Sequence, residues 1–324
     1  MVMRIVAQRH GGPEVLQPED AEIGAPGRGE IRVRHTAIGL NYIDTYHRTG
    51  LYPTNPPFTP GLEAAGVVEA VGKGVTGLKE GQRVAYGTGP MGAYAEARLM
   101  PADKAIAIPD GIDDRTAAAM MLKGMTVRYL ICETYKVQKG DTVLWHAAAG
   151  GVGLIACQWL KHLGVRVIGT AGSAEKADLA KRHGCDEAIL YKEEDVAKRV
   201  RDLTGGEGVP VVYDGVGKAT LAASLDSLRP RGLFVSFGNA SGPIKDFDLG
   251  LLSAKGSLYV TRPTVMTYTA TRAGLEANAA DLIEVVRGGA VTIPVNQTFA
   301  LKDARKAHEA LEGRETTGAT LLLP

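Results

Sequence analysis

The residues best suited to chemistry form a glycine-rich stretch, TVLWHAAAGGVG, at positions 142–153. Val143 to Trp145 have the pattern of a short buried strand, and Ala147 to Gly153 carry no long side chain, so phosphates can approach the backbone closely. From Val152 onward, apolar residues recur at helical spacing. A helix that begins here points free N–H groups and the positive end of its dipole at the turn, which suits an anion. The turn reads A-x-G-x-x-G, a variant of the dinucleotide fingerprint, although similar residues also build plain tight connections.

The sequence after this turn decides between those two interpretations, because strands and helices alternate along it. Apolar runs predict further strands at 165–169, 188–191, 209–214, 233–238 and 257–261, and the intervening segments predict helices near 174–183, 194–203 and 219–228. Such alternation implies right-handed crossovers and a parallel sheet that is covered on both faces. The sequence therefore predicts a doubly wound nucleotide-binding domain with its ligand at the carboxyl ends of the strands.

The end of the second predicted strand indicates which dinucleotide binds. An NAD site usually has Asp or Glu here for the ribose 2′-hydroxyl, but residues 169–173 are Gly-Thr-Ala-Gly-Ser. Ser173 can cap the next helix, Lys176 follows one turn later, and Tyr191 can pack on the adenosine end. A pocket without a carboxylate and with a nearby cation suits a 2′-phosphate, so we expect NADPH rather than NADH. The alternative for Lys176 is a solvated helix face.

Length and composition limit the class of protein. The 324 residues suit two domains, and the net charge of +1 without a basic run argues against nucleic acid as a main partner. No apolar run has transmembrane length, and the N-terminus lacks the apolar core of a secretory signal. Cys132, Cys157 and Cys185 are far apart in the sequence and form no C-x-x-C pair, so we expect reduced thiols and a cytoplasmic protein.

The two ends of the chain are predicted to build one further domain. Up to about residue 120, short strands, one of them at 92–99, alternate with Gly- and Pro-rich turns, which indicates a compact, largely β domain. Residues 115–122 are predicted to be helical and 124–136 to continue as a helix, and the chain ends with strand-like, helical and strand-like segments. The predicted division is a catalytic domain of residues 1–124 and 266–324, with a nucleotide-binding domain of residues 125–265 inserted between them.

This order of domains resembles the medium-chain dehydrogenase/reductase superfamily, and within it the zeta-crystallin-like NADPH:quinone oxidoreductases. The resemblance covers essentially the whole chain and is carried by HGGPEVL (10–16), GLNYIDTYHRTGLYP (39–53), LKGMTV (122–127), HAAAGGVGLIACQW (146–159), YDGVG (213–217), LFVSFGNASG (233–242) and GSLYVTRP (256–263). It implies an α/β fold with a GroES-like, mostly β catalytic domain and a doubly wound Rossmann cofactor domain. Zinc-dependent members use a Cys and a G-H-E histidine as ligands, but here Asn41 and Leu62 occupy those places. With no cysteine cluster either, a zinc site is not expected.

The resemblance also implies which residues act. The catalytic candidates are Asn41, which can donate an amide hydrogen bond to a carbonyl oxygen, and Tyr46 and Tyr52, which can donate O–H or stack on a flat ring, unless these tyrosines serve only packing. The family pattern places them beside the nicotinamide. The implied cofactor contacts are Thr126, Gly150, Gly151, Val152, Gly153, Ser173, Lys176, Tyr191, Phe237, Gly238, Asn239, Val260, Arg262 and Arg314. For Lys123 two predictions remain open, a contact with a cofactor phosphate or a position on the surface. The sixth strand of the nucleotide domain implies a homodimer.

Three functions remain open at this point. The first is an NADPH-dependent, zinc-independent quinone reductase, since a quinone accepts hydride easily without a Lewis acid. The second is a reductase of α,β-unsaturated carbonyls, because the same donor can reduce an activated alkene. The third is a non-catalytic NADPH-binding protein, in a crystallin-like or RNA-binding role; the near-zero net charge argues against RNA.

Overall fold

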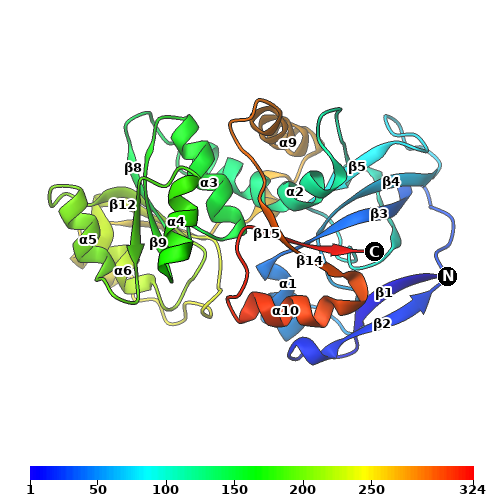
Figure 1. The fold of residues 1–324 in the computed structure, drawn as a ribbon, viewed down its shortest axis with the longest axis horizontal. Coiled ribbons are helices and arrows are strands. Elements are labelled where there is room, and N and C mark those ends of the chain that lie inside the picture. Colours follow the sequence, from blue (N-terminus) through cyan, green and yellow to red (C-terminus); the bar gives the residue numbers. More distant parts are fainter. The chain divides into compact units, whose positions relative to one another are not determined.

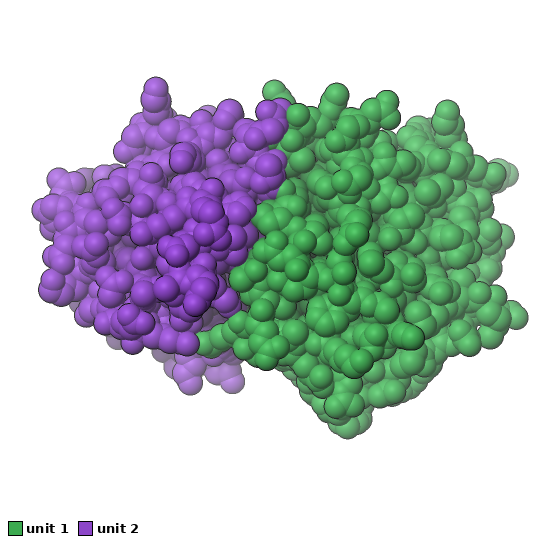
Figure 2. Space-filling view, in the orientation of Figure 1, with its two compact units in different colours: residues 1–125, 268–287, 293–324 green, residues 126–267, 288–292 purple.

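The computed structural model describes residues 1–324 and divides into two compact units (Figures 1 and 2). Unit 1 comprises residues 1–125, 268–287 and 293–324, and unit 2 comprises residues 126–267 and 288–292. The structure contains no helix that is both long enough and apolar enough to cross a membrane.

Unit 2 is built on a six-stranded sheet in which every pair of neighbours is parallel. Its strands are β8 (Thr142–Trp145), β9 (Arg166–Ala171), β10 (Glu187–Leu190), β11 (Val209–Asp214), β12 (Leu228–Ser236) and β13 (Tyr259–Thr261). Its helices are α3 (Gly151–His162), α4 (Ala174–Arg182), α5 (Val196–Leu203), α6 (Leu221–Ser227) and α7 (Gly250–Ala254). The strand order β10-β9-β8-β11-β12-β13 reverses at β8. In a doubly wound fold this reversal lies where a dinucleotide binds.

The hydrophobic pattern accounts for unit 2. All six residues of β11 are buried, as expected for a strand covered on both faces. The apolar side of α3 is buried through Leu154, Ile155 and Trp159. Ser173 caps α4 as predicted, since its Oγ accepts a hydrogen bond of 3.4 Å from the backbone N–H of Lys176. The doubly wound parallel sheet is thus confirmed.

Unit 1 is mainly β structure. Seven strands form one sheet, in the order β14-β15-β3-β4-β5-β7 with β6 also on β3, and β1 pairs with β2 separately. The strands are β1 (Val2–Ala7), β2 (Leu16–Ala21), β3 (Glu30–Leu40), β4 (Glu63–Val71), β5 (Arg83–Tyr86), β6 (Ala97–Pro101), β7 (Ile106–Ala107), β14 (Val295–Ala300) and β15 (Ala319–Leu323). Its helices include α1 (Tyr42–Thr49), α9 (Arg272–Arg287) and α10 (Ala304–Glu312), and α8 (Val265–Tyr268) ends at its border. The first 125 residues and the C-terminal segment 293–324 therefore share one core.

Two local predictions differ from the structure. A strand was expected at 92–99, but β6 starts only at Ala97, because Gly92, Ala93 and Tyr94 donate their backbone N–H groups to the 60–61 segment instead of a sheet neighbour. A helix was expected at 115–122, continuing over 124–136. The α-helix α2 (Asp114–Tyr129) covers the first segment but ends at Tyr129, and a π-helical turn follows at Leu130–Thr134.

Candidate active site

The glycine-rich turn of unit 2 joins β8 to α3. Gly150 is the N-cap of α3, so the N–H groups of Gly151, Val152 and Gly153 lie in the first turn, where a helix offers no backbone acceptors. A Cβ on Gly153 would lie 2.5 Å from the carbonyl oxygen of Ala147, so no larger residue fits there. Gly151, Val152 and Gly153 therefore present backbone donors at the start of a helix, whereas the Gly150 N–H donates to the Ala147 carbonyl. Such free donors are the chemistry that a pyrophosphate needs.

The residues expected at the 2′-phosphate lie together at the carboxyl ends of β9 and β10. Ser173 and Lys176 belong to the N-cap and first turn of α4, and Tyr191 follows β10. A Cβ on Gly172 would lie 2.8 Å from the Tyr191 hydroxyl oxygen, so the tyrosine closes over this loop. Glu175 is the acidic residue of that first turn, and it is fully exposed. Ser173, Lys176 and Tyr191 thus lie on neighbouring segments where an NAD site would hold a carboxylate, and a hydrogen bond with Ser173 lowers the pKa of the adjacent Glu175 carboxyl.

The segment after β12 was expected at the nicotinamide half. Phe237 packs against Trp145 with 5.7 Å between ring centroids, and its N–H donates to the carbonyl oxygen of Asp214. Gly238 passes so close to Gly215 that a Cβ would lie 2.2 Å from its carbonyl oxygen, and Asn239 follows. Arg262 Nη1 donates to Ser236 Oγ (3.0 Å) and to the Gly238 carbonyl (2.9 Å). Arg262 therefore holds this loop in place.

Three further predicted cofactor residues lie elsewhere. Val260, on the edge strand β13, is 40 % exposed. Thr126 lies within α2 and is half-buried. Arg314 is exposed, follows α10 in unit 1, and lies near enough to Tyr42 for its charge to lower the pKa of that tyrosine, which burial raises.

The predicted catalytic tyrosines form one aromatic cluster in unit 1. Tyr46 lies on α1, only 7 % exposed, and meets Tyr52 edge-on with 5.2 Å between ring centroids. Tyr42, also on α1, lies 5.7 Å from Tyr46. The Tyr52 N–H donates to the Tyr46 carbonyl, which ties the loop after α1 back to the helix. These rings can present a flat apolar surface with hydroxyl groups at its edge.

Asn41, the N-cap of α1, has its amide N–H groups occupied. Asn41 Nδ2 donates to Glu63 Oε2 at 2.8 Å and to the Gly39 carbonyl at 3.3 Å. Since Glu63 is an acceptor, the amide nitrogen and not its oxygen faces it. The predicted donation from Asn41 to a substrate carbonyl stays a prediction that this arrangement does not favour, because both amide N–H groups have acceptors and the side-chain oxygen accepts from the Asp44 backbone N–H in a capping box.

Glu63 and Lys123 form a buried ion pair beside Asn41. Lys123 Nζ lies 2.7 Å from Glu63 Oε2, with 6 % and 0 % of the two side chains exposed, and Glu63 Oε1 accepts the Leu122 N–H. Lys123 is thus buried, so the surface alternative for it is wrong, and the phosphate contact stays a prediction. The sequence signal for a buried partner is Glu63 itself, a carboxylate within the apolar run Leu62–Ala65.

The same region tests whether zinc would fit. No three His, Cys, Asp or Glu side chains in the structure lie close enough together to hold a metal ion. The carboxylate of Glu63 has an ammonium and an amide N–H as its neighbours instead of a metal, and Asn41 and Leu62 occupy the places of two zinc ligands. These residues do not fit a zinc ion.

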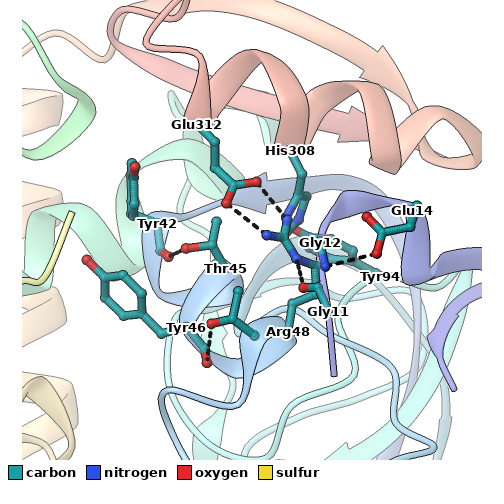
Figure 3. A network of polar contacts seen from close by, with 11 residues as sticks. Gly11, Gly12, Glu14, Tyr42, Thr45, Tyr46, Arg48, Tyr94, His308 and Glu312 are labelled. Atoms are coloured by element: carbon teal, nitrogen blue, oxygen red, sulfur yellow. Dashed lines mark hydrogen bonds and ion pairs between the residues drawn. The ribbon is translucent and has the colours of Figure 1, made fainter. Parts of the chain in front are cut away.

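A directed hydrogen-bond chain fixes the buried side of α1 (Figure 3). Arg48 is paired with Glu312 through both carboxylate oxygens, at 2.9 and 2.8 Å, and donates to His308 Nδ1. His308 Nε2–H therefore donates to the Tyr94 oxygen, and the Tyr94 hydroxyl donates to Asp44 Oδ2. Asp44 Oδ2 also accepts the Asn41 N–H at 2.9 Å, so the chain reaches the N-cap of α1.

Comparisons with known proteins agree with this geometry. The family model described as "Alcohol dehydrogenase GroES-like domain" matches residues 27–110, and that described as "Zinc-binding dehydrogenase" matches residues 151–283. A quinone oxidoreductase of Pseudomonas aeruginosa is 55 % identical over the full length of both chains. A 2-haloacrylate reductase of Burkholderia sp. is 46 % identical, covering 100 % of this chain and 99 % of the relative. The crystal structure of Escherichia coli quinone oxidoreductase complexed with NADPH superposes with a TM-score of 0.98 at 48 % identity, covering 99 % of this chain and 100 % of the other.

The chain belongs to the quinone oxidoreductases of the medium-chain dehydrogenase/reductase superfamily. The two units of this quinone oxidoreductase correspond to two domains with different features. Unit 1 is the GroES-like domain with the tyrosine cluster, and unit 2 is the Rossmann-like domain with the glycine-rich turn. The match to a zinc-binding family model reflects shared ancestry and not a zinc site, because the ligand positions in this quinone oxidoreductase hold other residues.

Proposed function

We propose that the protein is an NADPH:quinone oxidoreductase that works without zinc. The observation that carries the cofactor choice is the end of β9 beside Ser173, Lys176 and Tyr191, where residues 169–173 include no carboxylate for a ribose 2′-hydroxyl. The Escherichia coli relative complexed with NADPH supports the same choice. Relatives named quinone oxidoreductase support the acceptor.

In this proposal the bound nicotinamide supplies the hydride, and the protein binds and orients both reactants. The N–H groups of residues 151–153 hold the pyrophosphate, with Gly150 beside them as the N-cap, and Ser173 and Lys176 bind the 2′-phosphate. Thr126, Phe237–Asn239, Val260, Arg262 and Arg314 are proposed to contact the rest of the cofactor. Tyr46 and Tyr52 bind the flat quinone ring, and Asn41 orders the segment that carries them through its bond to Glu63.

Alkene reduction is the second candidate, because the 2-haloacrylate reductase is 46 % identical over the whole chain. A zinc-free hydride donor can reduce an activated alkene as well as a quinone. The two functions share one cofactor site and differ in the acceptor. An assay of the reaction product therefore distinguishes them, whereas a measurement of cofactor binding does not.

We also propose a cytoplasmic homodimer. Strand β13 forms one edge of the unit 2 sheet and exposes 61 % of Tyr259 and 40 % of Val260, an apolar edge that pairing with a second copy would cover. Cys157 and Cys185 are buried next to one another as free thiols, which supports a reducing compartment. Sedimentation of the wild type against Val260→Lys tests the dimer; a monomeric wild type contradicts it.

The decisive assay is oxidation of NADPH and of NADH by the purified protein with a benzoquinone, beside an α,β-unsaturated ketone. We expect turnover with NADPH and quinone. Lys176→Ala is expected to raise the KM for NADPH by about tenfold and leave that for NADH unchanged, because a charge-assisted hydrogen bond contributes about 1.5 kcal/mol or more. Lys181→Ala, in the last turn of the same helix, is the matched control. Turnover with the ketone alone would assign alkene reduction, and an equal effect of Lys176→Ala on NADH would contradict the 2′-phosphate assignment.

A further inference from the structure

A second directed hydrogen-bond chain lies in unit 2, at the point where the strand order reverses. It involves the residues that end or follow three neighbouring strands: Asp214 ends β11, His146 follows β8, and Thr170 lies near the end of β9. Ser224 joins them from α6. All four side chains belong to residues that are at most 2 % exposed, and none was among the predicted site residues.

The carboxylate fixes the direction of every bond in this chain. Ser224 Oγ donates to Asp214 Oδ2 at 2.8 Å, so its oxygen must accept from His146 Nε2–H at 3.0 Å. His146 Nδ1 is then an acceptor and takes the Thr170 hydroxyl proton at 3.2 Å. Burial lowers the pKa of His146, in keeping with this neutral form. Because Ser224 donates to the aspartate and not to the histidine, the three residues are not an activated nucleophile of the hydrolase kind.

The chain ends on the glycine-rich turn. Thr170 Oγ1, which donates its proton to His146, accepts the backbone N–H of Ala147 at 3.2 Å. Ala147 has φ +56°, the left-handed region, which is uncommon for a residue with a Cβ. Its carbonyl oxygen accepts the Gly150 N–H at 3.0 Å and touches the position that a Cβ on Gly153 would take. The conformation of Ala147 therefore sets where the first N–H groups of α3 point.

We infer that Asp214, Ser224, His146 and Thr170 act as positioning residues that hold Ala147 in its left-handed conformation and thereby shape the turn for the pyrophosphate. This inference rests on the proposed function, because it assumes that a dinucleotide binds in the turn. The pyrophosphate is common to NADPH and NADH, so the chain affects both cofactors alike, in contrast to Lys176.

The test replaces Thr170 by valine, which has the same shape without the hydroxyl, and by serine, which keeps the hydroxyl. Titration of protein fluorescence with NADPH and with NADH gives the two dissociation constants, and steady-state kinetics with a quinone give KM and kcat. Thr170→Val is expected to raise the dissociation constant and KM of both cofactors by the same factor, about fivefold, as for the loss of one net hydrogen bond. The KM for quinone is expected to stay unchanged, and Thr170→Ser to restore binding to within about twofold of the wild type.

Ser224→Ala interrupts the chain far from the turn and is expected to weaken both cofactors in the same ratio. Ser227→Ala is its control on the same helix, since the buried Ser227 hydroxyl donates only to the local Ala223 carbonyl. The inference is overturned if Thr170→Val binds both cofactors as the wild type does, or if serine is no better than valine at position 170. A wild type that binds neither cofactor would instead overturn the proposed function.

Discussion

Each unit buries a histidine in the middle of a directed hydrogen-bond chain, and the two chains end in different ways. In unit 1, the chain runs from the partly exposed Glu312 through Arg48 and His308 to Tyr94 (Figure 3), and from Tyr94 to Asp44. In unit 2 it runs from the exposed Ala147 through three buried side chains to the buried Asp214. Asp214 accepts from the N–H groups of residues 216 and 217 and from the hydroxyls of residues 220 and 224. Asp44, in contrast, has a buried Oδ1 with no partner.

In unit 1, burial and neighbouring charges determine which groups of the chain carry a proton. Burial, with the charge of Arg48, lowers the pKa of His308 to about 3, and burial raises the pKa of Asp44 to about 7. Lys123 and the hydrogen bonds from Asn41 and Tyr94 oppose the rise in the pKa of Asp44, and the charge of Glu63 adds to it. Since Oδ2 already accepts two hydrogen bonds, the proton of a neutral Asp44 resides on Oδ1. Folding thus takes a proton from His308 and adds one to Asp44.

The prediction with the largest expected effect concerns Glu312, the partly exposed end of the unit 1 chain. Glu312→Ala leaves the guanidinium of Arg48, 1 % exposed, without its bidentate partner. We expect the free energy of unfolding to fall by about 3 kcal/mol or more, because an uncompensated buried charge is costly. Urea unfolding measures it. Glu309→Ala, on the same helix but in an exposed pair with Arg305, is the control, and equal stabilities of the two variants would refute the dependence.

The next prediction concerns pH and the proton exchange between His308 and Asp44. A lowered histidine pKa gives stability that is lost as pH falls below 6.5, and a raised carboxyl pKa gives stability that is lost as pH rises above 3.8. Between these values the folded and unfolded forms of the pair bind the same number of protons, so the two effects cancel. Asp44→Asn removes one of them. Its unfolding free energy should therefore fall more steeply than that of the wild type on acidification, by about 1.4 kcal/mol per pH unit.

Urea titrations at several pH values between the ordinary pKa values of the two groups, 3.8 and 6.5, measure this slope. A control variant carries both Asp44→Asn and His308→Gln. The amide introduced by His308→Gln can accept from Arg48 and donate to Tyr94 without titrating, so the slope should return to that of the wild type. Parallel slopes for the wild type and Asp44→Asn would mean that the pair exchanges no proton on folding.

The sequence predicted an element of the fold correctly where its hydrophobic periodicity and its turn residues indicated the same element. The strand at 209–214 was predicted with its bounds because a largely apolar run between turn residues fits a strand covered on both faces. The strand expected at 92–99 failed for a reason that no local pattern carries: the partners of residues 92–94 lie more than thirty positions earlier, in the 60–61 segment. The segments that hold the predicted site residues were found through glycine spacing and family motifs.

The supporting contacts of the site were not predictable. Tyr94 meets His308 across 214 positions, and His146 meets Ser224 across 78, and neither histidine has ligand spacing in the sequence. Even Asn41, which was identified, has its N–H groups directed at a residue 22 positions away. A sequence read locally shows which side chains can donate or accept, but the direction of a hydrogen bond depends on all the partners at once.

The prediction with the smallest expected effect concerns Asp214, which accepts from four donors, whereas Asp44 accepts from two. Thr220 Oγ1 donates to Asp214 Oδ2 at 2.7 Å, beside the Ser224 hydroxyl. Thr220→Val removes one of the four donors to Asp214 and leaves the path through Ser224 and His146 complete. We expect a loss of about 1 kcal/mol in unfolding free energy, against little for Thr220→Ser, with NADPH binding unchanged in both. Weakened NADPH binding in Thr220→Val would instead show that the whole set of bonds on Asp214, and not the single path, shapes the turn.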